Sequence, residues 1–148
     1  MAAAVVVLAL ALVLAAPASA SFEKVGVFGA PGEEGQLSEF ASGVAVNDTT
    51  HDVYVADGYG NRVYRFSSKG ELLEGWGWGV ADNKGEFERC GKDGEAAHPK
   101  CNQEVFGVSG EGVGEFKQAQ GIAVDQTTGY VYVLNTGRQN GVVQVFKA

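Results

Sequence analysis

An internal repeat constrains the fold of this chain more than any other feature. The segment from Gly43 to Phe66 (GVAVNDTTHDVYVADGYGNRVYRF) returns as the segment from Gly121 to Phe146 (GIAVDQTTGYVYVLNTGRQNGVVQVF). The first eight shared pairs are offset by 78 residues and the last two by 80, because a turn of the second copy is longer. The pairs are Gly43/Gly121, Ala45/Ala123, Val46/Val124, Thr49/Thr127, Thr50/Thr128, Val53/Val131, Tyr54/Tyr132, Val55/Val133, Val63/Val143 and Phe66/Phe146. Such a repeat predicts one supersecondary unit built twice, with neighbouring units packed together.

Short apolar runs separated by polar turns predict strands within each copy. In the first copy we expect strands at residues 43–46, 53–56, 62–66 and 71–78, with turns at 47–52, 57–61 and 67–70. Turn residues at this spacing favour an antiparallel up-and-down sheet of four strands. The fold class predicted from the residues is therefore all-β.

The side-chain pattern predicts how each sheet is covered. The first two strands of the first copy are apolar on both faces, which is typical of a sheet packed between neighbours. The third strand carries Arg62 and Arg65 among apolar residues, so the later strands should meet water. This gradient favours a propeller blade, whose inner strands lie between adjacent blades.

These residues resemble the NHL repeat of β-propellers. The likeness rests on the Gly-Val/Ile-Ala-Val start of each copy, the Val-Tyr-Val-Ala-Asp run, and Asn61-Arg62-Val63 followed by Phe66. Gly35-Gln36-Leu37 and Gly114-Glu115-Phe116 match the lead-in of that repeat. The second copy departs from the pattern at Leu134-Asn135 and lacks a clear counterpart of Asn61-Arg62.

The resemblance implies a partial propeller of two four-stranded antiparallel blades. Blade 1 would cover about residues 43–79, blade 2 about 108–148, and an extra strand would lie at residues 22–29. A six-bladed ring would need three such chains, so a homotrimer is one expectation. A truncated piece of a longer propeller is the other, and the sequence leaves both open.

The N-terminal segment predicts export. Residues 1–16 carry no charged side chain, Pro17 ends the apolar run, and Ala18-Ser19-Ala20 supplies a small-residue cleavage pattern. We expect a signal helix within a signal peptide at residues 1–20 and a mature domain at 21–148. A retained membrane anchor would need about 20 apolar residues, more than this run provides. The expected location is therefore secreted or on the exterior of the cell envelope.

The charge balance excludes one class of partner. The chain has 11 Lys and Arg against 18 Asp and Glu, a formal net charge of −7. Nucleic acid binding depends on clustered basic residues that neutralise phosphates, and no such cluster occurs. We therefore expect no nucleic acid partner.

A segment at residues 80–107, here called the insertion, separates the two copies and contains Cys90, Cys101 and His98. We expect a surface excursion between blades. In an exported chain two cysteines favour a disulfide; a zinc site formed by Cys90, His98 and Cys101 is the alternative. Secreted bacterial proteins with NHL repeats resemble this chain in carrying a two-cysteine insertion here.

Motifs for catalysis are missing from the sequence. His51 and His98 are the only histidines, too few for the metal-ligand set of a propeller lyase, and no Gly-x-Ser-x-Gly or P-loop motif occurs. We therefore predict no catalytic residue, no metal and no cofactor. Trp76, Trp78 and Phe106 form either an aromatic binding ledge or core between blades.

Turn residues remain as candidates for ligand contact. They either face a shared ligand surface or cap turns by accepting hydrogen bonds from backbone N–H groups. The candidates are Asp57, Asn61, Arg62, Asn135 and Arg138. The sequence thus predicts a secreted, non-enzymatic binding or scaffold module that presents propeller loops to a protein, peptide or glycan. The alternatives are a metal-dependent propeller enzyme of the lyase or lactonase type, and a truncated fragment without function.

Overall fold

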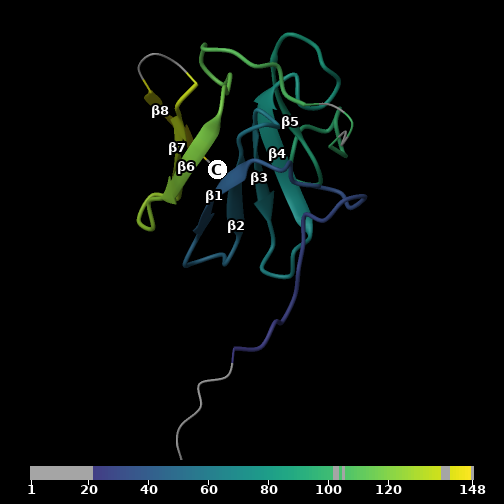
Figure 1. Cartoon of the computed structure of the whole chain (residues 1–148), viewed down its shortest axis with the longest axis vertical. Helices are drawn as coiled ribbons and strands as arrows, with labels where there is room; N and C mark the ends of the chain where they lie inside the picture. Colours follow the sequence, from purple (N-terminus) through teal and green to yellow (C-terminus); the bar gives the residue numbers. More distant parts are fainter. Residues whose placement is uncertain (1–21, 102–103, 105, 138–140, 148) are drawn as a thin grey trace, which may run out of the picture.

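The structure is a computed structural model that describes residues 22–101, 104, 106–137 and 141–147, and all regular structure in that part is β. Two antiparallel sheets form, ordered β1-β2-β3-β4-β5 and β6-β7-β8 (Figure 1). The strands are β1 (Ala41–Val46), β2 (Val53–Asp57), β3 (Arg62–Phe66), β4 (Leu72–Trp78), β5 (Phe87–Cys90), β6 (Ala119–Val124), β7 (Tyr130–Asn135) and β8 (Val142–Lys147). The described residues include no helix that could span a membrane. The predicted signal helix lies outside them.

The two copies of the repeat build the same local structure. In the β1–β2 turn the side chain of Asn47 accepts hydrogen bonds from the amides of Thr49 and Thr50, at 2.9 and 3.0 Å. Asp125 accepts the corresponding bond from Thr127, at 2.8 Å, in the β6–β7 turn. Such side-chain caps favour tight turns. The predicted all-β, antiparallel character of both copies is confirmed.

Strand register repeats as well. Gly43 faces Ala56 in the first sheet and Gly121 faces Leu134 in the second. In β1 and in β6 the strand register shifts just before that glycine, between Ala41 and Gly43 and between Ala119 and Gly121. The copies are thus equivalent in backbone register, which places equivalent side chains on equivalent faces.

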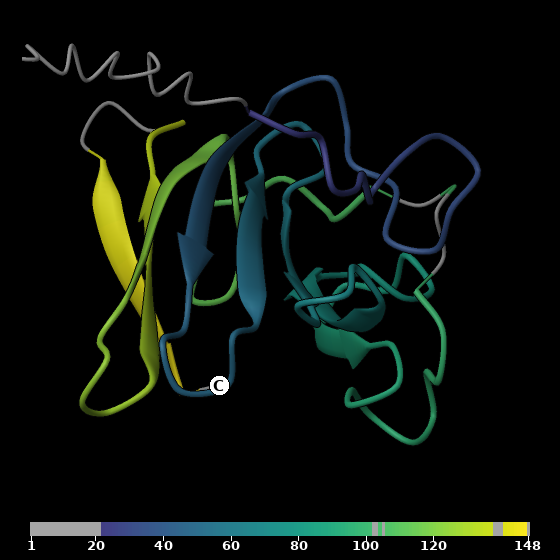
Figure 2. The ribbon, with the colours of Figure 1, turned by 90° about the horizontal axis from the view of Figure 1, so that it is seen from below.

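The main core lies between the two sheets. Tyr54, Ala56, Val63 and Trp76 of the first sheet pack against residues of the second sheet and the segment before it. Those partners are Phe116, Ala119, Ile122, Val124, Val131, Val133 and Phe146. Strands β1 and β6 lie side by side where the sheets approach most closely (Figure 2). A Cβ added to Gly43 would overlap the carbonyl oxygen of Gln120, so a glycine there allows the sheets to meet.

The other face of the first sheet is covered by the chain itself. Tyr64 and Phe66 are buried there beneath Phe28, Leu37 and the pair of cysteines in the insertion. The insertion is therefore more than the expected surface excursion. It supplies β5, which pairs with β4 and adds a fifth strand to the sheet.

The strand expected at residues 22–29 is absent. These residues form no regular structure, and those before Phe28 extend away from the sheets, with Val25 96% exposed (Figure 1). Phe28 instead packs its ring 4.9 Å from that of Phe66. The prediction was wrong. The segment pairs with no strand, and the outer edge of β4 is already paired with β5.

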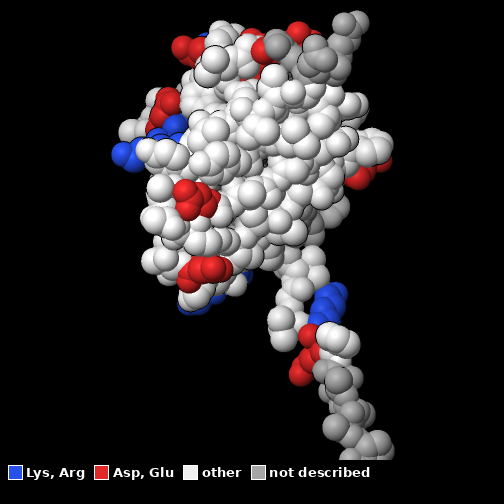
Figure 3. Space-filling view, turned by 90° about the vertical axis from the view of Figure 1, so that its left-hand side faces the viewer, with Lys and Arg blue, Asp and Glu red and all other residues white. Residues whose placement is uncertain are grey.

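Two apolar surfaces remain open. On β1, Val44 is 68% exposed, so the prediction that both faces of the first two strands are covered is wrong for this strand. The second sheet has three strands in the described residues, one fewer than a complete blade of four. Its outer face exposes Tyr130, Tyr132, Leu134, Val143 and Val145. In Figure 3, which views this side of the molecule, uncharged residues occupy the centre and charged ones lie toward the margins.

Candidate functional site

A groove of about 850 Å³ opens where the β2–β3 turn meets the segments that lead into β1 and β6. Three aromatic side chains, Phe40, Tyr59 and Phe106, stand along it and are here called the aromatic ridge. Their ring centroids are 5.8 Å apart for Phe40 and Tyr59, and 5.4 Å apart for Tyr59 and Phe106. Tyr59 remains 55% exposed, so the ridge presents ring surface to solvent.

Polar side chains line the rest of the groove. The lining residues are Glu39, Phe40, Ala41, Ser42, Gly58, Tyr59, Asn61, Phe106, Ser109, Lys117, Gln118 and Gln120. A neighbouring hollow of about 430 Å³ shares Glu39, Tyr59 and Phe106 with the groove. Tyr59 and Phe106 of the aromatic ridge therefore line both hollows. Aromatic walls with a few polar groups are the usual lining of a ligand site.

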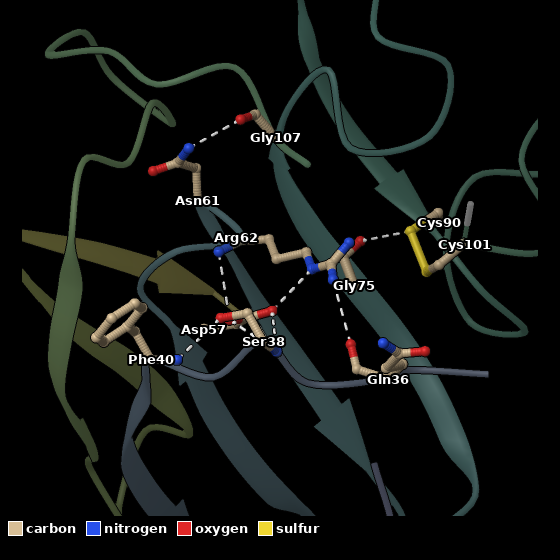
Figure 4. Close-up of polar contacts among 11 residues, drawn as sticks. Gln36, Ser38, Phe40, Asp57, Asn61, Arg62, Gly75, Cys90, Cys101 and Gly107 are labelled. Atoms are coloured by element: carbon tan, nitrogen blue, oxygen red, sulfur yellow. Dashed lines mark hydrogen bonds and ion pairs between the residues drawn. A yellow bond between two sulfur atoms is a disulfide. The ribbon is translucent and has the colours of Figure 1, made fainter. Parts of the chain in front are cut away.

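Backbone contacts of the β2–β3 turn hold the ridge in place. The side-chain amide of Asn61 donates to the carbonyl of Gly107 at 3.0 Å, and the Gly107 amide donates to the carbonyl of Gly60 at 2.8 Å (Figure 4). Asn61 has a positive φ of 49°, which asparagine tolerates better than most residues. The end of the insertion, and with it Phe106, is thus fixed beside Tyr59.

A buried ion pair lies under the ridge. Arg62 Nε donates to Asp57 Oδ2 at 3.1 Å, with the two side chains 2% and 0% exposed. Asp57 also accepts hydrogen bonds from the amides of Ser38 and Gly60, each at 3.3 Å, and from the Ser38 hydroxyl. A terminal nitrogen of Arg62 donates to the carbonyl of Gln36 at 3.2 Å (Figure 4). The pair therefore binds the lead-in segment to the β2–β3 turn.

Asn135 has the equivalent position in the second copy. Its side-chain oxygen accepts a hydrogen bond from the amide of Lys117 at 2.8 Å, and its nitrogen donates to the carbonyl of Glu115 at 3.3 Å. Asn135 is fully buried. Asp57 and Asn135 thus fix the two lead-in segments that form opposite sides of the groove.

The predicted ligand-facing residues therefore divide into three groups. Three of them are buried: Asp57, Arg62 and Asn135. Asp57 and Arg62 pair with each other, and Asp57 and Asn135 accept hydrogen bonds from backbone amides, as in the alternative that these residues cap turns. Asn61 lines the groove. Arg138 lies outside the described residues.

Of the predicted aromatic ledge, Phe106 lies in the groove, whereas Trp76 is 4% exposed and belongs to the core between the sheets. Sequence reasoning missed Phe40 and Tyr59. A signal existed for Tyr59, because an aromatic residue between two glycines in a hairpin turn has little chance of being buried.

The cysteines are paired as predicted. The Cys90 and Cys101 sulfur atoms lie 2.11 Å apart, at disulfide distance. The zinc alternative through these two thiols is therefore wrong. A disulfide is compatible with an extracellular protein.

His98 lies instead beside two carboxylates of the insertion. Donor atoms of Asp82, Glu88 and His98 are all within 4.8 Å of one another. The Lys84 ammonium group beside Asp82 holds the pKa of that carboxyl near 2, and burial raises the pKa of Glu88. The sequence concealed this cluster because its members come from a turn, a strand and a loop of the insertion.

Tyr64 predicts a pH dependence of stability. Burial raises the pKa of its phenol from 10.0 to about 12, and in the described part of the chain its hydroxyl has no hydrogen-bond partner. Below pH 10 the phenol is neutral in both states. Between pH 10 and about 12 the unfolded chain loses the proton while the folded chain keeps it, so stability should fall by roughly 2–3 kcal/mol. Urea unfolding at pH 9 to 12 measures this, and Tyr64→Phe should lose less stability than the unaltered chain. Equal slopes for both proteins would contradict the assignment.

No protein-family model matches the chain, and no curated protein matches it. The geometry of the groove is therefore the main guide to its function.

Proposed function

We propose that this chain is an exported, non-enzymatic binding module built of NHL-type propeller blades, and that its groove binds a neutral glycan. The observation that carries the proposal is the solvent-exposed aromatic ridge with amide side chains beside it. Ring faces of Phe and Tyr stack on the C–H faces of sugars. Asn61, Gln118 and Gln120 can each donate to and accept from hydroxyl groups.

The charge of the groove also favours a neutral ligand. Glu39 and Lys117 are the only charged residues in the described part of its lining, and their formal charges cancel. General acid–base hydrolysis of a glycan requires a pair of carboxyl groups, and the described lining has one. Binding without turnover is thus the better match to this set of residues.

The equivalence of the two sheets supports the propeller architecture. The face of the first sheet that carries Tyr54, Ala56 and Val63 packs on the second sheet. The residues at the equivalent positions of the second copy lie on the exposed outer face of the second sheet. They are Tyr132, Leu134 and Val143.

The first sheet of another copy could cover this outer face once the segments that lie over its own Tyr64 and Phe66 move aside. Three copies would complete six blades. This assembly predicts a mass near three times that of the monomer by light scattering, and a monomer at all concentrations would contradict it.

Replacing Tyr59 with alanine tests the binding site. The variant should weaken glycan binding at least tenfold, because it removes the central ring of the ridge, and it should leave the unfolding free energy within about 0.5 kcal/mol. Glycan-array screening followed by titration calorimetry measures the affinity. Tyr130→Ala is the matched control, since Tyr130 is an exposed tyrosine on the outer face of the second sheet.

The proposal predicts unchanged affinity for Tyr130→Ala. An equal loss of glycan affinity in both variants would contradict it. So would a chain that binds unfolded peptides and none of the glycans tested.

A further inference from the structure

The strongest feature outside the groove is the Asp82–Glu88–His98 cluster in the insertion. It joins two carboxylates and an imidazole, with donor atoms within 4.8 Å of one another. These residues come from the turn after β4, from β5, and from the loop that the disulfide closes. Oxygen and imidazole nitrogen donors in such a set are ligands for divalent transition metals.

Glu88 provides a rigid and incompletely satisfied donor. It lies in β5 opposite Gly77 of β4 and is 1% exposed. One carboxylate oxygen, Oε2, accepts hydrogen bonds from the amides of Ala81 and Asp82, at 2.6 and 3.4 Å. The other oxygen, Oε1, is buried and has no hydrogen-bond partner among the described residues. A buried polar atom in this state is costly unless another group or ion satisfies it.

The disulfide brings His98 to this carboxylate. Glu88 lies two residues before Cys90, and His98 lies three residues before Cys101. The Cα atoms of the two cysteines are 4.9 Å apart. The backbone of His98 is fixed by a bond from the Gly91 amide to its carbonyl, at 3.0 Å, and by its own amide donating to the Glu95 carbonyl, at 2.9 Å.

Asp82 is the adjustable member. One of its oxygens accepts the amide of Lys84 at 3.0 Å, and the other pairs with the Lys84 ammonium group. The Lys84 side chain is 71% exposed, so it can turn into solvent when a cation takes its place. Metal–ligand distances of about 2.0–2.2 Å put tetrahedral donors roughly 3.4 Å apart. The cluster must therefore contract by about an ångström, which side-chain rotation of the partly exposed Asp82 and His98 allows.

We propose that Asp82, Glu88 and His98 form a binding site for a divalent transition metal, with Zn²⁺ as the preferred ion. Three protein ligands leave one coordination position for water or for an outside donor. Binding would join three parts of the insertion: the turn after β4, β5, and the loop that the disulfide closes. The site is separate from the groove and does not depend on the glycan proposal.

Titration calorimetry and thermal unfolding with Zn²⁺, on the exported chain with its disulfide intact, test this proposal. We expect one Zn²⁺ per chain with a Kd of 10 μM or tighter and a raised melting temperature. His98→Ala should weaken binding at least tenfold, and Glu88→Gln should do the same. His51→Ala is the control, because it removes the other histidine, in the β1–β2 turn, and should leave the affinity unchanged.

Cobalt gives a second readout that does not rely on stability. Co²⁺ bound by the three residues should show visible absorption of a low-symmetry site, and this band should be missing in His98→Ala. Failure of the unaltered chain to bind Zn²⁺ at 100 μM would overturn the proposal. Equal Zn²⁺ affinity in His98→Ala and the unaltered chain, or binding of Ca²⁺ in preference to Zn²⁺, would overturn it as well.

Discussion

Replacing Asp57 with alanine is expected to lower the free energy of unfolding by about 3–5 kcal/mol. The carboxylate is fully buried and is the acceptor for Arg62 Nε, the Ser38 amide and the Gly60 amide. Its removal leaves the Arg62 guanidinium in the interior without this counter-charge, and breaking one half of a buried ion pair costs more than losing a neutral hydrogen bond. Urea unfolding of the variant measures the loss.

The second copy of the repeat supplies the matched control. Asn135 holds the same position and also binds a lead-in backbone, but it is neutral, and it bonds to the amide of Lys117 and the carbonyl of Glu115. Asn135→Ala should therefore cost about 1–3 kcal/mol. If Asp57→Ala cost no more than Asn135→Ala, the ion pair would not be the source of the effect.

A double-mutant cycle separates the ion pair from the other bonds of Asp57. Arg62→Met keeps much of the buried chain length and removes the charge. If the pair is the main term, Asp57→Ala should cost at least 1 kcal/mol less in the Arg62→Met background than in the unaltered chain. The same cycle bears on the groove, because Asp57 fixes the Ser38 end of the lead-in segment that carries Phe40.

Local sequence patterns predicted the strands well because turn chemistry defines them. Asn47-Asp48-Thr49-Thr50 and Asp125-Gln126-Thr127-Thr128 cap their own turns, so each hairpin follows from a few neighbouring residues. The disulfide was likewise predictable, since Cys90 and Cys101 are the only cysteines of the sequence and its N-terminal segment predicts export.

Features that depend on distant contacts were not predictable. β5 exists because residues of the insertion find the free edge of β4, and nothing within 87–90 reveals that partner. Residues 22–29 have an apolar alternation typical of a strand, yet no strand edge meets them. In the groove, Phe40, Tyr59 and Phe106 come from three separate segments. Only the fold brings them together.

Replacing Gly43 with alanine is expected to cost about 3 kcal/mol of unfolding free energy, near the upper end for overpacked sites. The new Cβ would overlap the carbonyl oxygen of Gln120, where β1 and β6 approach each other. The obstacle is backbone, so no side-chain rotation relieves it and the sheets must separate. Urea unfolding measures the cost, and a value below about 1 kcal/mol would show that the sheets separate easily.

Gly121→Ala makes the same change at the equivalent position of the second copy. There the nearest neighbour of a Cβ is the Leu134 side chain of the same sheet, at 3.3 Å, because the outer face is open. Its effect on monomer unfolding should stay within about 1 kcal/mol.

In the proposed ring, however, another sheet lies against Gly121 as the second sheet lies against Gly43. Gly121→Ala should then lower the mass measured by light scattering while leaving the unfolding free energy of the dilute monomer nearly unchanged. A variant that associates as well as the unaltered chain would refute stacking at this face.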